Sequence, residues 1–526
     1  AQVTHVLSSS NRFPAILSMC DIKRPIPKSS IPMPPPVAKS CIEVAFTVSP
    51  LAKSLSPRKR NPYGMAAMPP KLAPSRFRAE LAETLRVAGP LALANLLQMA
   101  IGATDVIFVA RLGQEALAAS SLSVSIFMLI AWSLSGLTGA VAPLISAERG
   151  AGRHAVREIR RSMRMGLWLA VGSGTLAMSV GSFGETIMLA TGQDPRVAAR
   201  ADTFLDIITW AIVPLIAANA LRTFVAAMGR PIFATAITAG AIAVNALCNW
   251  IFIYGHFGLP ALGLEGSALA TVVTGLATLA AYVVAIQSDR RLRRYHLFGR
   301  WWQPHWQRLG EIARIGLPIA LIVIAEGGFF GAAGFLTGRI GPAELAGHTL
   351  ALQVAALAFQ VPFGVGQAAT IRAGFHFGAE DRQGVAMAGR AALAVAFAFS
   401  FVAASVMVLF PRLVLSLYVD VDHPANAVMV ALAVQYLVVA SAFQLFDGIQ
   451  AVAAGLLRGL QDTRVPMVMA LFGYWVAGFG IAIFLGFFTA WSGVGVWLGL
   501  AAGLVGGSVP LVWRWRDRER LQLVPF

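Results

Sequence analysis

The stretch Ala427-Val-Met-Val-Ala-Leu-Ala-Val-Gln-Tyr-Leu-Val-Val-Ala-Ser-Ala-Phe-Gln-Leu-Phe-Asp447-Gly-Ile-Gln-Ala-Val-Ala-Ala-Gly-Leu456 contains a single charged side chain, that of Asp447. A helix of about 20 apolar residues crosses a hydrocarbon core roughly 30 Å thick. Similar stretches recur along the chain, which is 57% hydrophobic and only 13% charged. A soluble protein cannot cover so much apolar surface with so few polar side chains. The sequence therefore predicts an all-α membrane protein.

Twelve transmembrane helices are predicted, six in each half of the chain. The first six spans are 87–109, 117–146, 163–189, 199–227, 232–254 and 264–287. The second six are 310–337, 344–371, 385–417, 427–456, 466–488 and 492–513. Several of them exceed 25 residues, so we expect those helices to tilt or to extend beyond the bilayer.

The arginines predict the orientation of these spans. Residues 72–526 contain 32 arginines and no lysine. With twelve spans, 27 of the arginines fall on the side that holds both termini, and only five fall on the other side: Arg111, Arg196, Arg200, Arg339 and Arg412. The positive-inside rule then places both termini in the cytoplasm, and the expected location is a bacterial inner membrane. Because the charges lie between apolar spans, the net charge of +17 does not indicate a nucleic-acid partner.

A shift of 228 residues superimposes the two halves. It places Pro90 on Pro318, Gly113 on Gly341, Leu117 on Leu345 and Gly150 on Gly378. An even number of spans in each half gives both halves the same orientation, which is a parallel repeat. We expect a first six-helix lobe with a cytoplasmic linker at 76–303, and a second lobe with a short basic C-terminal tail at 304–526. Paired lobes of this kind are typical of carriers that work by alternating access.

Residues 1–71 differ in kind from the rest. They hold all six lysines and many prolines and serines, and they lack any long apolar stretch. The composition predicts disorder. We interpret the segment as a non-native N-terminal extension, with Met65 or Met68 as the natural start; a transit peptide is the alternative. No disulfide framework or cysteine metal site is predicted from Cys20, Cys41 and Cys248.

Three acidic residues lie well inside apolar spans: Asp105 in the first, Glu326 in the seventh and Asp447 in the tenth. A charge at this depth costs roughly 2.5–3.5 kcal/mol on insertion scales. No lysine or arginine lies within a turn of any of them along its own helix. A buried carboxylate without such a partner binds a cation or a proton, so we predict cation- or proton-coupling residues. A structural hydrogen bond from a protonated acid is the alternative.

Neutral polar residues in the spans are candidate cation or cavity ligands. Asn245 and Asn249 are spaced i,i+4 and share one helix face, where they could complete a cation site or link two helices. The 228-residue shift places Gln98 where the second half has Glu326. Further candidates are Thr271, Gln353 and Gln450. No cofactor is expected, and no metal beyond a transported Na⁺.

Several motifs resemble the multidrug and toxic compound extrusion (MATE) family, in particular its NorM-type branch. They are Ala103-Thr-Asp-Val-Ile-Phe-Val-Ala-Arg-Leu-Gly113, the stretch from Asn245 to Gly258, Glu326, and the stretch from Asp447 to Arg464. The resemblance covers about residues 76–515. It implies a V-shaped pair of six-helix lobes that exchanges Na⁺ or H⁺ for amphipathic, often cationic, drugs. Phe443 departs from the pattern, since some relatives have a tyrosine there, and this leaves the coupling ion open.

Other functional classes fit the sequence less well. A lipid-linked precursor flippase of the same superfamily is the alternative function, but such carriers tend to have cationic cavities, whereas the intramembrane charges here are acidic. The histidines form no HExxH or paired motif, so no enzyme is predicted. No Walker A sequence is present, which argues against ATP as the direct energy source. The expected partners are small organic cations or amphipathic drugs, Na⁺ or H⁺, and the lipid bilayer, and we expect a monomer.

Overall fold

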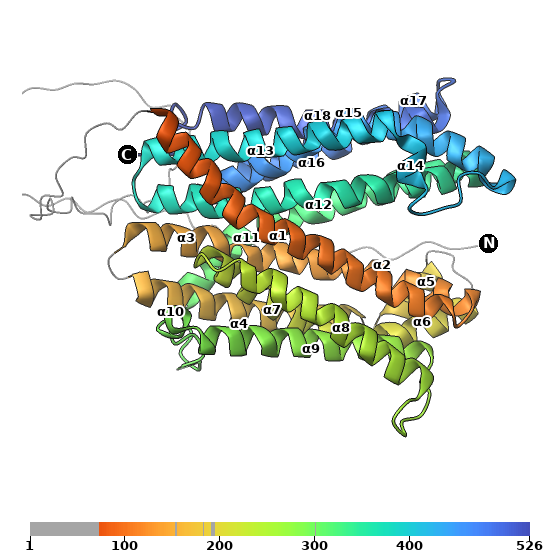
Figure 1. Ribbon diagram of the computed structural model, residues 1–526, viewed down its shortest axis with the longest axis horizontal. Coiled ribbons are helices and arrows are strands. Elements are labelled where there is room, and N and C mark those ends of the chain that lie inside the picture. The colour runs from red at the N-terminus through yellow and green to blue at the C-terminus, as the bar shows by residue number, and fades with distance from the viewer. Residues whose placement is uncertain (1–72, 153–154, 182, 191–194, 300) are drawn as a thin grey trace, which may run out of the picture. The chain divides into compact units, whose positions relative to one another are not determined.

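The computed structural model describes residues 73–526, apart from 153–154, 182, 191–194 and 300. Within these residues the secondary structure is helical throughout, with no strand (Figure 1). The predicted disordered extension, residues 1–71, lies outside the described residues.

The first half of the chain forms ten α-helices. They are α1 (Ala73–Ala110), α2 (Gln114–Gly139), α3 (Val141–Ala151), α4 (Ala155–Gly181), α5 (Gly184–Ala190), α6 (Pro195–Ile208), α7 (Ile212–Ala227), α8 (Ile232–Tyr254), α9 (Leu264–Ser288) and α10 (Arg290–Arg293). The helices α2 and α3 together form the second predicted span. The fourth consists of α6 and α7, joined by the short 3-10 helix η2 (Thr209–Ala211).

The second half begins with α11 (Trp306–Ile340), and the predicted boundary at 303/304 falls just before it. Its other elements are α12 (Pro342–Gly378), α13 (Arg382–Leu409), α14 (Pro411–Leu415), the 3-10 helix η3 (Pro424–Asn426), α15 (Ala427–Gly459), α16 (Arg464–Leu471), the π-helical segment η4 (Phe472–Gly478), α17 (Phe479–Phe487) and α18 (Ser492–Arg516). The eleventh predicted span is therefore interrupted by a π-helical turn, a geometry that is frequent at functional sites.

Eleven helical segments of the described chain are long and apolar enough to cross a membrane, with adjoining helices such as α2 and α3 counted as one segment. The remaining predicted span corresponds to α4, whose first turns carry four arginines that lower its hydropathy. Two predicted spans are too long at one end. The third breaks after Gly181, and the ninth ends at Leu409 because Pro411 begins the separate helix α14.

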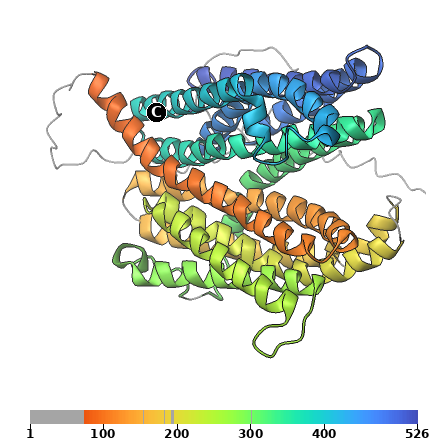
Figure 2. The same cartoon turned by 45° about the vertical axis from the view of Figure 1, so that its right-hand side comes forward.

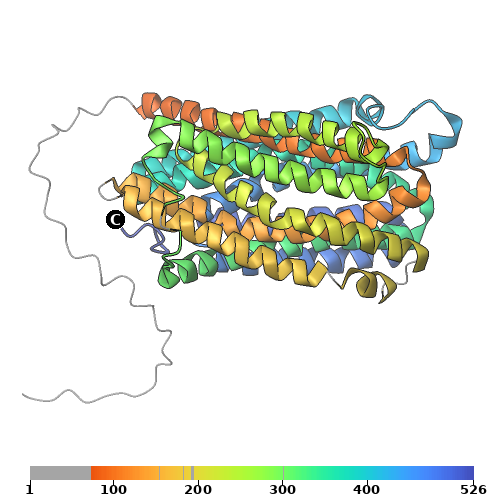
Figure 3. The same ribbon diagram turned by 90° about the horizontal axis from the view of Figure 1, so that it is seen from below.

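The ends of the helices sort as the arginine pattern predicts. The C-terminus, the start of α1 and α10 lie at one end of the helices, and α5, α6 and α14 lie at the other (Figure 1). Turning the molecule shows the same separation, with the long helices side by side between the two ends (Figure 2, Figure 3). We refer to the end with the C-terminus and α10 as the arginine-rich end.

The repeat is visible in equivalent features of the two halves. Pro90 lies inside α1 and Pro318 inside α11. Gly113 and Gly341 are the residues that immediately precede α2 and α12. Residues separated by 228 in the sequence therefore occupy the same place in equivalent helices.

The two halves meet through contacts that obey the same shift. A Cβ added at Gly364 on α12 would lie 2.7 Å from the Cα of Ala92 on α1, and one at Gly136 on α2 would lie 3.4 Å from the Cα of Ala320 on α11. Both members of the second pair differ from the first by 228 residues. The helices α1 with α12 and α2 with α11 are therefore equivalent interfaces, related by the axis of the repeat.

At the arginine-rich end a second pair of contacts is closer still. A Cβ at Gly378 would lie 1.8 Å from the carbonyl oxygen of Ala147, and one at Gly150 would lie 2.0 Å from that of Phe375. These two contacts are again related by the 228-residue shift. Only glycine lets the ends of α3 and α12 pack backbone against backbone.

An ionic cluster joins α1 to α12 near these glycines. Arg372 donates from Nε and Nη2 to the two carboxylate oxygens of Glu80, at 2.7 and 2.5 Å. His376 contacts the same carboxylate through Nε2 at 3.1 Å and Asp381 through Nδ1 at 3.3 Å. The side chains of Glu80 and Arg372 are 9% and 18% exposed, so the pair is largely shielded from solvent. A two-point arginine–carboxylate contact of this kind fixes the relative position of two helices.

Candidate ion-coupling sites

The first cluster lies between α1 and α8. The Oδ1 atom of Asp105 accepts hydrogen bonds from the Nδ2 atoms of Asn245 at 2.9 Å and Asn249 at 2.7 Å. The i,i+4 spacing puts both amides on the face of α8 that meets α1, as the sequence indicates. The structure therefore brings together three of the five polar residues predicted for the first half.

The chemistry of this cluster is set by its acceptors. Both asparagine side chains are fully buried, and neither Oδ1 atom has a hydrogen-bond partner in the structure. Buried acceptors without donors cost free energy, roughly 1–3 kcal/mol each. A cation bound beside Asp105 would give these oxygens a positive charge to coordinate, and a proton bound by Asp105 would give them an O–H donor.

The second cluster is centred on Tyr474, in the π-helical segment η4. Its hydroxyl accepts a hydrogen bond from Nε2 of Gln450 on α15, and its ring stacks on Phe329 of α11 at 5.3 Å between centroids. Gln450 lies one turn after Asp447, and Phe329 lies one turn after Glu326. Tyr474 thus contacts the segments of α11 and α15 that carry the two acids. The carboxylates of Glu326 and Asp447 interact electrostatically with each other and with Tyr474.

An arginine completes this second cluster. Arg458 lies three helical turns after Asp447 on α15 and interacts electrostatically with Glu326 and Tyr474. Its Nε atom is buried and has no hydrogen-bond partner. Arg458 therefore acts on Glu326, whereas Asp447 lies three turns away from it on the same helix. Two carboxylates and one guanidinium leave one negative charge, which a single monovalent cation or proton at Asp447 would balance.

Sequence reasoning missed Arg458 and Tyr474. Arg458 lies on a different helix from Glu326 and three turns away from Asp447, so the spacing of residues along one helix does not indicate it. Tyr474 gave a weak signal, as the one tyrosine in the apolar span 466–488. Its place in a π-helical turn depends on packing that the sequence does not show.

The environment of Phe443 explains how the chain accommodates that residue. Phe443 is 1% exposed and stacks on Trp497 of α18 at 5.5 Å between ring centroids. Gln444, the next residue, is fully buried, and neither atom of its amide has a hydrogen-bond partner. Phe443 therefore packs in the core, and the side-chain oxygen of Gln444 is an additional buried acceptor on α15.

The remaining predicted ligands lie apart from the contacts that define the two clusters. Thr271 donates to the carbonyl of Ser267 in its own helix, at 3.2 Å. Gln98 and Gln353 have exposed side chains on α1 and α12. Within the described part of the chain, no group of three or more histidine, cysteine, aspartate or glutamate residues could hold a metal ion.

Comparison with known proteins connects these clusters to a family. The MatE family model matches the chain twice, at residues 90–251 and 318–484. The two matches begin 228 residues apart, at Pro90 and Pro318. The chain belongs to the MatE family. Its fold is the V-shaped, twelve-helix fold of that family, with two parallel six-helix repeats.

Relatives in several bacteria support this assignment over most of the chain. The probable multidrug resistance protein NorM of Mesorhizobium japonicum is 43% identical over 85% of this chain and 95% of its own length. The multidrug resistance protein NorM of Burkholderia vietnamiensis is 37% identical over 85% of this chain and 95% of its own length. The family consists of multi-pass membrane transporters, so the chain is a membrane transporter by its family.

Solved structures share the fold at low sequence identity. The Vibrio cholerae MATE transporter VcmN, crystallised as a point mutant, superimposes with a TM-score of 0.78 at 17% identity, covering 86% of this chain and all of that one. A MATE transporter in a bent conformation superimposes with a TM-score of 0.75 at 19% identity, covering 86% of this chain and 98% of the other.

Proposed function

We propose that the protein is a cation-coupled antiporter that exports amphipathic, often cationic, drugs and toxic organic compounds in exchange for Na⁺ or H⁺. It acts as a monomer in a bacterial inner membrane, with both termini in the cytoplasm. The similarity to proteins named for multidrug resistance supports the substrate class. The observation that carries the coupling is the cluster around Tyr474, with Glu326, Asp447 and Arg458.

The charge balance of this cluster gives the coupling step. One uncompensated negative charge remains inside the protein when the site is empty, and charges at this depth are costly. The site is therefore more stable with a cation or proton bound. If the occupied and empty forms favour different arrangements of the two halves, a cation gradient drives the transition between them, which is the thermodynamic basis of antiport.

The cluster at Asp105 adds a second position for cation chemistry in the other half of the molecule. The repeat makes the two halves alike in backbone but different in polar content, since Ala333 is the counterpart of Asp105 and Gln98 the counterpart of Glu326. We propose that Asp105, with Asn245 and Asn249, contributes a separate proton or cation step. The acidic character of both clusters favours cationic substrates over the acidic lipid-linked precursors of a flippase.

Inverted membrane vesicles test the proposal. A fluorescent organic cation is added outside vesicles whose lumen holds either excess Na⁺ or excess H⁺, with the two gradients imposed separately. We expect uptake of the dye with at least one gradient, and loss of uptake when an ionophore dissipates that gradient. Uptake that requires ATP, or that is the same with and without either gradient, would contradict cation-coupled antiport.

A further inference from the structure

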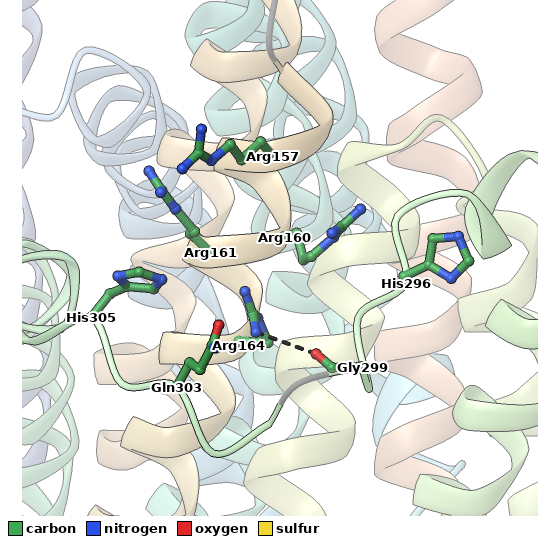
Figure 4. Close-up of a pocket in the computed structure, with 8 residues that line it drawn as sticks. All are labelled: Arg157, Arg160, Arg161, Arg164, His296, Gly299, Gln303 and His305. Carbon is green, nitrogen blue, oxygen red and sulfur yellow. Dashed lines mark hydrogen bonds between the residues drawn. The ribbon is translucent and has the colours of Figure 1, made fainter.

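A pocket of about 480 Å³ opens at the arginine-rich end, between α4 and the linker that joins the two halves (Figure 4). Four arginines of α4 and two histidines of the linker line it: Arg157, Arg160, Arg161, Arg164, His296 and His305. The arginine spacing of i, i+3, i+4 and i+7 places all four side chains on one face of the helix. None of the residues that line this pocket carries a carboxylate.

Backbone carbonyls of the linker hold two of the arginines in place. Arg160 donates from Nε to the carbonyl oxygen of Tyr295 at 2.6 Å, and Arg164 donates from Nη1 to that of Gly299 at 3.2 Å. A carbonyl orients a guanidinium but brings no formal negative charge. Arg161 pairs with Glu158 at 2.8 Å, and both side chains are partly exposed. Beyond the pair of Arg161 with Glu158, the charges of Arg157 and Arg160 leave a surplus of positive charge at the pocket.

The tryptophans beside the pocket indicate its depth in the membrane. Trp168, one turn after Arg164, donates from Nε1 to the carbonyl of Trp301 at 3.1 Å and stacks on its ring. Trp302 and Trp306 are 75% and 69% exposed. Tryptophans concentrate at the level of the lipid headgroups, and beyond Trp168 the helix α4 is predominantly apolar. The pocket therefore lies where phosphate groups of the bilayer lie.

We propose that this pocket binds a phosphate-bearing anion, and that the anion is the headgroup of an acidic phospholipid. Guanidinium groups match phosphate oxygens in geometry and charge, and basic pockets beside transmembrane helices bind such headgroups. The volume is in the range of small-ligand sites. The headgroup lies between α4 and the linker, so its binding ties the connection between the two halves to the first half.

The test uses the purified full-length protein in a neutral detergent, with bound lipid counted by native mass spectrometry. Phosphatidylglycerol is the acidic probe, phosphatidylcholine the zwitterionic lipid, and glycerol 1-phosphate the soluble anion. The variant Arg157→Gln/Arg161→Gln removes two charges without touching the bonds to Tyr295 and Gly299. Arg196→Gln/Arg200→Gln is the matched control, because it removes two equally spaced arginines of α6 at the opposite end.

We expect phosphatidylglycerol to bind the unaltered protein and the control variant more tightly than phosphatidylcholine does. At about 1 kcal/mol for each arginine near an anionic surface, the pocket variant should bind phosphatidylglycerol roughly 25-fold more weakly. Equal affinity of the pocket variant and the control for phosphatidylglycerol would overturn the site. Binding of glycerol 1-phosphate that matches phosphatidylglycerol and is lost in the same variant would overturn the lipid assignment and leave a soluble phosphate as the ligand.

Discussion

Replacement of Gly378 by alanine should separate the arginine-rich ends of the two halves. The added Cβ would meet the carbonyl oxygen of Ala147 at 1.8 Å, whereas Cβ atoms essentially never approach another heavy atom closer than 3.0 Å. The oxygen belongs to the backbone of α3, and a Cβ is fixed in place by its own backbone, so a side-chain rotation cannot relieve the contact. The ends of α3 and α12 must therefore move apart.

The magnitude follows from the cost of overpacking, which is about 1–3 kcal/mol for one added methyl group in a tight interface. Alanine also stabilises a helix by about 1 kcal/mol relative to glycine, but this contribution to the free energy is the same whether the two helix ends are together or apart. The equilibrium between the two arrangements should therefore shift by roughly 5–150-fold toward the arrangement with separated ends.

Spin labels at Ala151 and Ala379 report this change, because the two exposed positions follow the contact and are related by the 228-residue shift. Their distance distribution, measured by double electron–electron resonance, should gain a long component in Gly378→Ala. Gly240→Ala is the matched control, since a Cβ at Gly240 in α8 meets no atom within 4 Å. Identical distributions in the unaltered protein and Gly378→Ala, or an equal change in the control, would refute the reasoning.

Three further substitutions test the clusters. Glu80→Gln keeps the shape of the side chain but removes the negative charge that Arg372 and His376 contact, so it should lengthen the distance between the spin labels at Ala151 and Ala379. An unchanged distance would show that the ionic cluster does not hold the two ends together. Tyr474→Phe keeps the stacking on Phe329 and removes the hydroxyl that accepts the hydrogen bond from Gln450. The cation concentration for half-maximal efflux should therefore rise about tenfold, and an unchanged concentration would show that Tyr474 is not part of the site. Asp105→Asn should lower efflux without changing the accessibility of the arginine-rich loops to labelling reagents, and normal efflux with unchanged ion dependence would reduce Asp105 to a structural hydrogen-bonding role.

The fold was largely predictable from the sequence, because each level of the prediction rests on a local signal. A long apolar stretch defines a span by itself, and the 228-residue shift appears in residues such as Pro90 and Pro318 without any knowledge of packing. Where the prediction was wrong, helix breaks within apolar sequence were responsible. The apolar run through Phe410 hides the end of α13, since hydropathy does not report where a helix stops.

The candidate sites were predictable only in part. Asp105, Asn245 and Asn249 were identified by their polarity, and the structure brings them together. Arg458 was assigned to a loop side, because its distance from Glu326 depends on how α11 packs against its neighbours. Gln98 and Gln353 lie apart from the two clusters, and their role as cavity ligands stays a prediction, since a polar residue within a span need not belong to an ionic cluster. The repeat predicts equivalent backbone positions but does not indicate which of them share a contact.

The most direct test of the account is gradient-driven export in variants of the second cluster. Efflux of an organic cation into inverted vesicles is measured, per molecule of protein in the membrane, for Glu326→Gln and Asp447→Asn. Glu265→Gln is the control for loss of an exposed carboxylate. The account predicts that both cluster variants insert normally and lose gradient-driven transport, while the control transports at the unaltered rate. Normal gradient-driven transport in both cluster variants would contradict it.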